Sequence, residues 1–159
     1  MQLSVIVPTN NLTHRTINTI ESLKFSQTNY EVLVVVDSIA SDDIKIAKKL
    51  STMDDVKLLY STYGQGISNT LNYGLHHATG DVILRIDDGD INLRSDLSEE
   101  ISLLDKYDLI CASMSALTDN HRKNLIIKPR IRTYNGRLSP FARVPHPTWI
   151  FKRSSDSSL

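Results

Sequence analysis

The sequence predicts one α/β domain in which a mainly parallel sheet is flanked by helices. Short apolar segments rich in β-branched residues alternate with segments of helical periodicity, an order typical of βαβ units. The apolar segments do not alternate with polar residues, which indicates strands that are covered on both faces. The length of 159 residues suits a single domain with one core.

Three strands and two helices are expected in the first part of the chain. Residues 3–7 are apolar and β-branched, and we expect Pro8 to end this strand. Residues 32–36 and 56–60 predict the second and third strands. The helices between them have candidate N-caps and apolar residues at helical spacing: Thr13 before Ile17, Ile20 and Leu23, and Asp42 before Ile44, Ala47 and Leu50.

A third helix and a fourth strand follow a break at Gly64 and Gly66. One face of this helix is apolar, with Ile67, Leu71, Leu75 and Ala78. Gly74 lies inside it, where glycine costs about 1 kcal/mol relative to alanine, so we expect close packing against a strand or a ligand. We expect Gly80 to end the helix, and residues 82–86 to form the strand.

The pattern becomes weaker in the last third of the chain. Asp96 and Glu99 have the spacing of a capping box at the start of a fourth helix, and residues 109–112 predict a fifth strand. After about residue 115 the alternation stops. Further strands are expected within residues 125–131 and at residues 149–151.

The composition argues against several classes of protein. The 18 basic residues balance 18 acidic residues, so no overall positive charge favours nucleic-acid binding. No apolar run approaches the roughly 20 residues of a transmembrane helix, and no signal peptide is visible. The single cysteine, Cys111, lies in an apolar run and is expected to be a buried, inert thiol. We therefore expect a cytoplasmic protein.

The most informative stretch is residues 80–90, a short apolar strand that ends in Asp87, Asp88 and Asp90. Carboxylates so close together repel one another, and a hard cation bound to an anion such as a diphosphate would relieve the repulsion. A solvated acidic turn before a helix is the alternative interpretation. Nothing within this stretch alone separates the two.

Other polar loops follow the strands at the same expected edge of the sheet. They contain Pro8 to Asn11, Asp37, and Gly64 to Gly66. Because ligands bind where the carboxyl ends of parallel strands meet, we expect these loops and the acidic cluster to form one site. Asp37 has the chemistry to accept hydrogen bonds from a base or a ribose, or to serve as a helix-entry turn residue.

In the order of its motifs the chain resembles the family 2 glycosyltransferases of the GT-A (Rossmann-like) fold. The resemblance covers roughly residues 3–153. Its motifs are Pro8, Thr9 and Asn11; Asp37 with Ser41 and Asp42; Gly66 with Asn72 and Gly74; Gly80 with Arg85 and the acidic cluster from Asp87 to Asp90; and the segment from Pro145 to Arg153, which contains His146.

This resemblance implies a nucleotide-diphosphate sugar as donor, which we expect to be a UDP-sugar, and inverting transfer to an acceptor hydroxyl. A carboxylate of the acidic cluster would hold Mn²⁺ or Mg²⁺ against the diphosphate. The acceptor would be a glycan or a lipid-linked molecule. The residues implied to bind the nucleotide sugar are Pro8, Thr9, Asn11, Asp37, Gly66, Asn72, Asp87 and Asp88.

The same resemblance divides the chain into regions of one domain. Residues 1–115 are expected to form the donor-binding βαβ region, and residues 116–153 the acceptor side. Residues 154–159 are polar and expected to be a frayed tail.

Two departures from the family pattern affect the expected site. The cluster position that usually binds the metal is Gly89, which leaves Asp88 and Asp90 as candidate metal ligands. The family's general base is normally an acidic residue beyond the segment around Arg153, and this chain ends at Leu159 without an evident replacement. By residue type, His146 is the candidate base, and a structural turn histidine is the alternative.

Three functions therefore stay open at this point. The first is a glycosyltransferase, and the second is a non-catalytic or truncated nucleotide-sugar-binding domain that needs a partner. The third is a nucleotidyltransferase, which the sequence favours least. Enzymes of that class cradle a triphosphate with a glycine-rich loop after the first strand, and the loop from Pro8 to Asn11 has no glycine.

Overall fold

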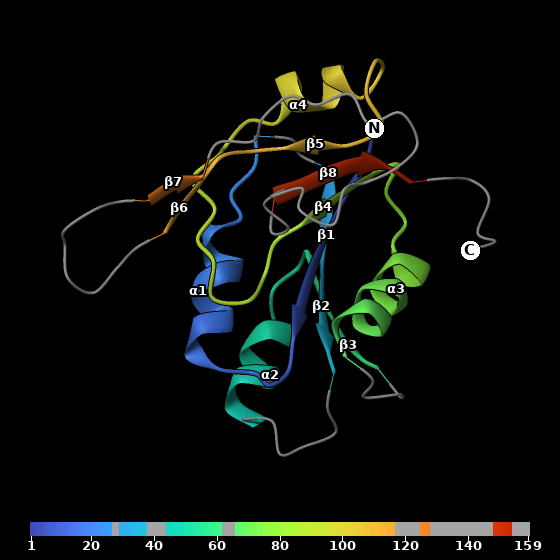
Figure 1. Ribbon diagram of the computed structural model, residues 1–159. Coiled ribbons are helices and arrows are strands. Elements are labelled where there is room, and N and C mark those ends of the chain that lie inside the picture. Colours follow the sequence, from blue (N-terminus) through green and yellow to red (C-terminus); the bar gives the residue numbers. More distant parts are fainter. Residues whose placement is uncertain (27–28, 38–43, 62–65, 117–124, 128–147, 154–159) are drawn as a thin grey trace.

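The computed structural model describes residues 1–26, 29–37, 44–61, 66–116, 125–127 and 148–153 (Figure 1). Within them, the strands are β1 (Leu3–Thr9), β2 (Tyr30–Val36), β3 (Val56–Tyr60), β4 (Val82–Arg85), β5 (Ile110–Cys111), β6 (Met114–Ala116), β7 (Leu125–Ile127) and β8 (Trp149–Lys152). The helices are α1 (His14–Ser22), α2 (Ile44–Ser51), α3 (Ile67–His77) and α4 (Ser98–Leu103). The predicted α/β architecture is confirmed.

The main sheet is parallel except at one side. Its strand order is β3-β2-β1-β4-β8-β5, and β6 pairs with β7 in a separate small sheet. β1 pairs in parallel with both β2 and β4, and β2 pairs in parallel with β3. β8 enters between β4 and β5 and is antiparallel to both. The predicted last strand at residues 149–151 is thus an internal strand of the sheet.

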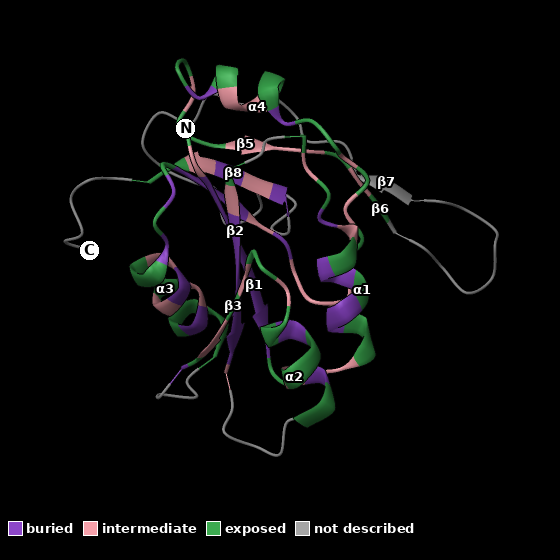
Figure 2. Cartoon of the chain, turned by 180° about the vertical axis from the view of Figure 1, so that it is seen from behind, coloured by how far each residue is buried: buried purple, intermediate pink, exposed green. Residues whose placement is uncertain are grey.

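Helices cover both faces of the parallel strands (Figure 1). α1 and α2 lie on one face, where their apolar residues pack against Val5, Val7 and Val34. α3 lies on the other face, against Ile6, Leu33 and Val35. The central strands are therefore buried on both sides, as Figure 2 shows, and this explains their unbroken apolar sequence.

Gly74 of α3 allows the helix to approach the sheet closely, as predicted. A Cβ atom at this position would lie 2.8 Å from Cγ2 of Ile6 and 3.1 Å from Cγ2 of Val35. A larger residue would therefore push α3 away from β1 and β2.

The prediction that Pro8 ends the first strand was wrong, because β1 continues to Thr9 with Pro8 in register with Val35. Residues of a strand alternate in the direction of their backbone groups, and the carbonyl of Ile6 accepts from Ile86 on the β4 side. Position 8 faces that same side, beyond the point where β4 stops pairing. The N–H that proline lacks would point to the carbonyl of Ile86, so Pro8 ends the pairing with β4. The ladder with β2 uses the backbone groups on the other side of β1, so it continues past Pro8 to Thr9.

Two predictions about helix ends were also wrong. Gly80 does not end α3; it packs against β1, where an added Cβ would lie 2.7 Å from the backbone nitrogen of Ser4. α4 begins at Ser98 without a side-chain cap, and Asp96 instead accepts hydrogen bonds from the N–H and hydroxyl of Ser98. The expected cap at Asp42 lies outside the described residues.

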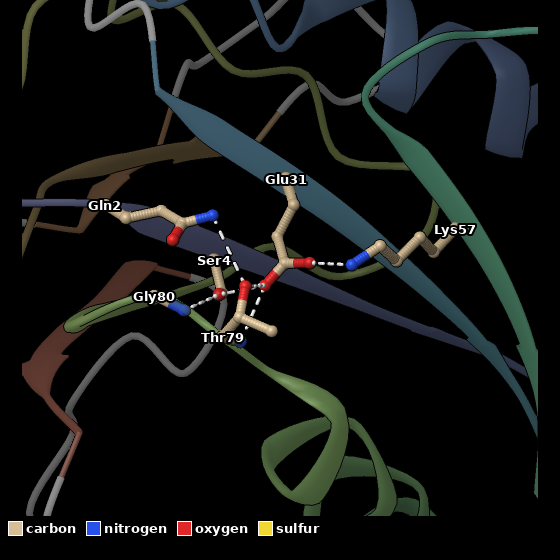
Figure 3. A network of polar contacts seen from close by, with 6 residues as sticks. All are labelled: Gln2, Ser4, Glu31, Lys57, Thr79 and Gly80. Atoms are coloured by element: carbon tan, nitrogen blue, oxygen red, sulfur yellow. Dashed lines mark hydrogen bonds and ion pairs between the residues drawn. The ribbon is translucent and has the colours of Figure 1, made fainter.

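A buried carboxylate network ties the amino-terminal ends of the parallel strands together (Figure 3). Glu31, at the start of β2, accepts hydrogen bonds from the hydroxyl of Ser4 and from the backbone and hydroxyl of Thr79, each at 2.7 Å. Its other oxygen pairs with Nζ of Lys57 at 2.6 Å. The backbone N–H of Gly80 donates to Ser4 Oγ at 2.8 Å, which brings β4 into the network. Loops lie at the opposite, carboxyl-terminal edge of these strands.

Among the described segments, no helix combines the length and the apolar composition that a membrane span requires.

Candidate functional site

The loops at the carboxyl-terminal edge of the sheet surround a pocket of about 710 Å³. This volume lies in the range of small-molecule sites. The walls come from the ends of β1, β2 and β4 and from the first turns of α1 and α3. The lining residues are Pro8, Thr9, Asn10, Asn11, Thr13, Arg15, Asp37, Gly66, Ile67, Thr70, Asp87 and Asp88.

Thr9 connects the end of β1 to the acidic cluster. Its hydroxyl donates to Oδ2 of Asp88 at 2.7 Å, and it also lies 2.8 Å from the carbonyl of Asn11. The N–H of Asn11 points back to the same hydroxyl at 3.3 Å. Thr9 therefore fixes both the turn after β1 and one carboxylate of the pocket.

Asp37 stands at the end of β2, facing the start of α3. Its Oδ2 accepts the N–H of Gly66 at 3.2 Å, and Gly66 has the positive φ of 90° that favours glycine. Its Oδ1 is buried and has no hydrogen-bond partner among the described residues. One oxygen of Asp37 thus accepts a hydrogen bond from the start of α3, and the other has no partner among the described residues.

The acidic turn after β4 has three carboxylates in different environments. Both oxygens of Asp87 are held by Arg85, at 2.7 and 3.1 Å. Asp88 uses Oδ2 for Thr9, and its buried Oδ1 has no partner within the described part of the chain. Asp90 does not line the pocket; burial, and then the charges of Asp87 and Asp88, raise the pKa of its carboxyl. Asp88 therefore lines the pocket and has one buried oxygen without a hydrogen-bond partner among the described residues.

Two helices direct their amino-terminal ends at the pocket. Thr13 is the N-cap of α1, as predicted, and its side chain accepts from the N–H of Arg15. Gly66 precedes α3 and provides no side-chain cap. Helix amino termini carry unpaired N–H groups and partial positive charge, so they favour anions. The pocket combines this positive potential with the acceptor oxygens of Asp37 and Asp88.

Most of the residues predicted for the site line this one pocket, namely Pro8, Thr9, Asn11, Asp37, Gly66, Asp87 and Asp88. Asn72 is exposed on α3 and, like Asp90, is not part of the lining. His146 lies outside the described residues.

Sequence reasoning missed two residues of α1 that contribute to the site. Arg15 lines the pocket. Thr19, four residues later on the same helix face, accepts the N–H of Gly89 at 3.0 Å and donates to the carbonyl of Asp90 at 2.9 Å. The only signal was a threonine within the apolar face of α1.

Comparison with known proteins finds a matching family model and related sequences. A family model described as "Glycosyl transferase family 2" matches residues 4–158. The chain is 30% identical over 140 residues to the Escherichia coli UDP-Glc:alpha-D-GlcNAc-diphosphoundecaprenol beta-1,3-glucosyltransferase WfgD, covering 86% of this chain and 54% of that protein.

Solved structures show the same fold. The crystal structure of S. aureus TarS 1–349 superposes with a TM-score of 0.66 at 23% identity, covering 96% of this chain and 47% of that one. The mannosyltransferase PcManGT from Pyrobaculum calidifontis, in complex with GDP-Man and Mn²⁺, gives a TM-score of 0.55 at 23% identity, covering 70% of this chain and 35% of that one. The chain spans about half or less of the length of these proteins.

Proposed function

The chain belongs to glycosyl transferase family 2, and on that premise we propose that its pocket binds a nucleotide-diphosphate sugar, with a UDP-sugar as the donor. The observation that carries this proposal is the pair of buried oxygens, Oδ1 of Asp37 and Oδ1 of Asp88, without partners among the described residues. A buried acceptor without a hydrogen-bond partner costs free energy of folding. We therefore expect a ligand to supply a donor or a cation to each of these two oxygens. TarS complexes with UDP and UDP-GlcNAc, and the UDP-Glc in the name of WfgD, support UDP as the nucleotide.

The proposed nucleotide contacts come from the strand ends. Asp37 accepts a hydrogen bond from the base or the ribose through Oδ1, while Oδ2 stays on Gly66. Pro8, Thr9 and Asn11 line the nucleotide from the end of β1. Asp87, which Arg85 holds in place, accepts from the ribose through its remaining lone pairs. The diphosphate lies toward the amino termini of α1 and α3, where partial positive charge favours it. Asn72 lies outside the lining and has no contact in this proposal.

The pocket fits a divalent metal ion through one carboxylate, and we assign this role to Asp88. Magnesium sites at phosphates use one or two carboxylates, with phosphate oxygens and water completing the shell. The oxygen of Asp88 that has no partner suits that requirement, and the described residues contain no group of three or more His, Cys, Asp or Glu side chains suited to a metal. A bound Mn²⁺ or Mg²⁺ would supply positive charge beside the leaving diphosphate. Asp90 is the second candidate ligand.

The proposed reaction is transfer with inversion to an acceptor hydroxyl. The acceptor oxygen forms a bond to the anomeric carbon, the bond from that carbon to the diphosphate oxygen breaks, and a base takes the hydroxyl proton. His146 is the proposed base, and residues 116–153 the proposed acceptor side; both fall largely outside the described residues. A glycan or lipid-linked acceptor is proposed because the name of WfgD gives a diphosphoundecaprenol-linked GlcNAc.

Calorimetric titration of UDP, and then of GDP, with and without Mn²⁺ tests the donor site. We expect UDP to bind, more tightly with the metal. Asp88→Asn should remove the gain from the metal, while Asp54→Asn, on an exposed turn at the opposite edge, should retain it. If Asp90→Asn removes the gain and Asp88→Asn does not, Asp90 is the ligand. If neither nucleotide binds to the folded chain, the proposal is wrong.

A second candidate function is nucleotide-sugar binding without transfer, in cooperation with a partner. Gly89 favours it, because the turn lacks the side chain that usually binds the metal in the family pattern. Release of UDP from UDP-Glc or UDP-GlcNAc separates the two functions. Binding of the sugar nucleotide without any release of UDP during prolonged incubation would favour the second.

A further inference from the structure

The side chain of Arg15 occupies the space that Gly89 leaves in the acidic turn. A Cβ built on Gly89 would lie 2.8 Å from Nη2 of Arg15, 3.2 Å from Nε and 3.4 Å from Cζ. Gly89 also has a φ of 93°, which side chains rarely adopt. The guanidinium therefore packs across the position where the side chain of another residue would begin.

This arrangement is held by the turn of α1 that follows Arg15. Thr19 is fully buried and binds the backbone of the acidic turn through Gly89 and Asp90. Residues four apart lie on the same face of a helix, so the contact at Thr19 also determines which part of the acidic turn lies beside Arg15. The backbone position from which Arg15 reaches the turn is thus set by the fold.

The positive charge of Arg15 is not used by the neighbouring acids. Asp87 and Asp88 line the same pocket, but Arg85 holds Asp87 and Thr9 holds Asp88. The guanidinium makes no hydrogen bond or ion pair with any residue that the structure describes. Arg15 lines the pocket from the first turn of α1, where the helix amino terminus adds partial positive charge.

We infer that Arg15 binds the diphosphate of the nucleotide, as a cation beside the metal position proposed at Asp88. The inference rests on the proposed function. It adds Arg15 as the residue that balances the negative charge of the diphosphate. A planar guanidinium matches two phosphate oxygens at once, which an ammonium cannot do. Because this charge belongs to the chain, a substantial part of the affinity for UDP remains when divalent metal is removed. The acidic turn thus contributes Oδ1 of Asp88, and α1 contributes the guanidinium of Arg15.

The test compares a nucleotide with its nucleoside in the presence of EDTA. UDP is titrated calorimetrically into the wild type, Arg15→Met, Arg15→Lys and Lys24→Met; uridine binding is followed by ligand-observed NMR. Lys24 is an exposed cation just after α1, outside the pocket lining, so its substitution controls for net charge. Urea denaturation of each variant verifies that the fold is retained, which is expected because Arg15 is exposed.

We expect Arg15→Met to weaken UDP binding by on the order of tenfold to a hundredfold, the range for a hydrogen bond to a charged group, and to leave uridine binding unchanged. Arg15→Lys should lie between the wild type and Arg15→Met, and Lys24→Met should match the wild type. If Arg15→Met binds UDP as tightly as the wild type does, or loses uridine to the same extent as UDP, the inference is wrong. If the wild type binds neither UDP nor GDP, the proposed function itself has failed.

Discussion

Replacing Glu31 by Gln would measure how much the buried carboxylate network contributes to stability. The side chain of Glu31 is 7% exposed, and four donor groups from Ser4, Thr79 and Lys57 point at its two oxygens. Burial by itself raises the pKa of this carboxyl. The hydrogen bonds from Lys57, Thr79 and Ser4 together outweigh burial and lower the pKa from 4.5 to about 2.

The size of this pKa shift sets the expected change in stability. The ionised form is favoured in the folded chain, so its stabilisation is present in full above pH 4.5 and is lost as the pH falls toward 2. The fall of the pKa from 4.5 to about 2 corresponds to about 3 kcal/mol at neutral pH. At pH 3 about 1 kcal/mol of it remains. Glutamine resembles the protonated acid, so Glu31→Gln should lose about 3 kcal/mol at pH 7 and about 1 kcal/mol at pH 3.

Urea denaturation at the two pH values measures these differences. The matched control is Glu21→Gln, because Glu21 pairs with Lys49 at 2.7 Å but is 51% exposed, and exposed pairs contribute roughly 0–1 kcal/mol. The two substitutions remove ion pairs of similar length, so burial is the variable under test. Equal losses for Glu31→Gln and Glu21→Gln, or a loss at Glu31 that does not change between pH 7 and pH 3, would refute this reasoning.

Three further predictions concern single positions. Gly80→Ala should destabilise the chain by about 1–3 kcal/mol in urea denaturation, because its Cβ would lie 2.7 Å from the backbone nitrogen of Ser4, which cannot move independently of β1; a loss below 0.5 kcal/mol would contradict the close approach. Cys111 should react slowly with iodoacetamide at pH 8, because burial raises the pKa of its thiol to about 11, and rapid labelling of the folded chain would disagree with that burial. Thr19→Val should cost about 1–3 kcal/mol, because it leaves the N–H of Gly89 without an acceptor, whereas Thr52→Val, on an exposed turn, should cost far less in the same assay.

The sequence was sufficient to predict those strands and helices whose formation depends on the residues within them. The second strand lies in an unbroken Leu- and Val-rich run, and the first helix has a threonine cap and apolar spacing, so both were found. The errors at Pro8 and Gly80 have a different origin. Whether proline ends a strand depends on which neighbouring strand its missing N–H would face, and whether glycine ends a helix or fits against a strand depends on the distance to that strand. Neither property is a feature of the local sequence.

The same distinction applies to the site. Thr9, Asp37 and Asp88 could be grouped in advance, because parallel strands bring their carboxyl ends to one edge. Arg15 and Thr19 could not, because their roles depend on how the acidic turn packs against α1. The three carboxylates of the turn also differ because of this packing. Asp87 pairs with Arg85, Asp88 accepts from Thr9 through one oxygen, and Asp90 lies outside the pocket lining.

The insertion of β8 determines the order in which the sheet can be completed. β1 to β4 belong to the first part of the chain and pair with one another, but the gap between β4 and β5 is filled only by Trp149–Lys152. Until that segment has left the ribosome, β4 is an edge strand of apolar sequence with unpaired backbone groups, and such edges promote association between chains. Fragments that stop short of β8 should therefore aggregate even though they contain every strand that borders the pocket.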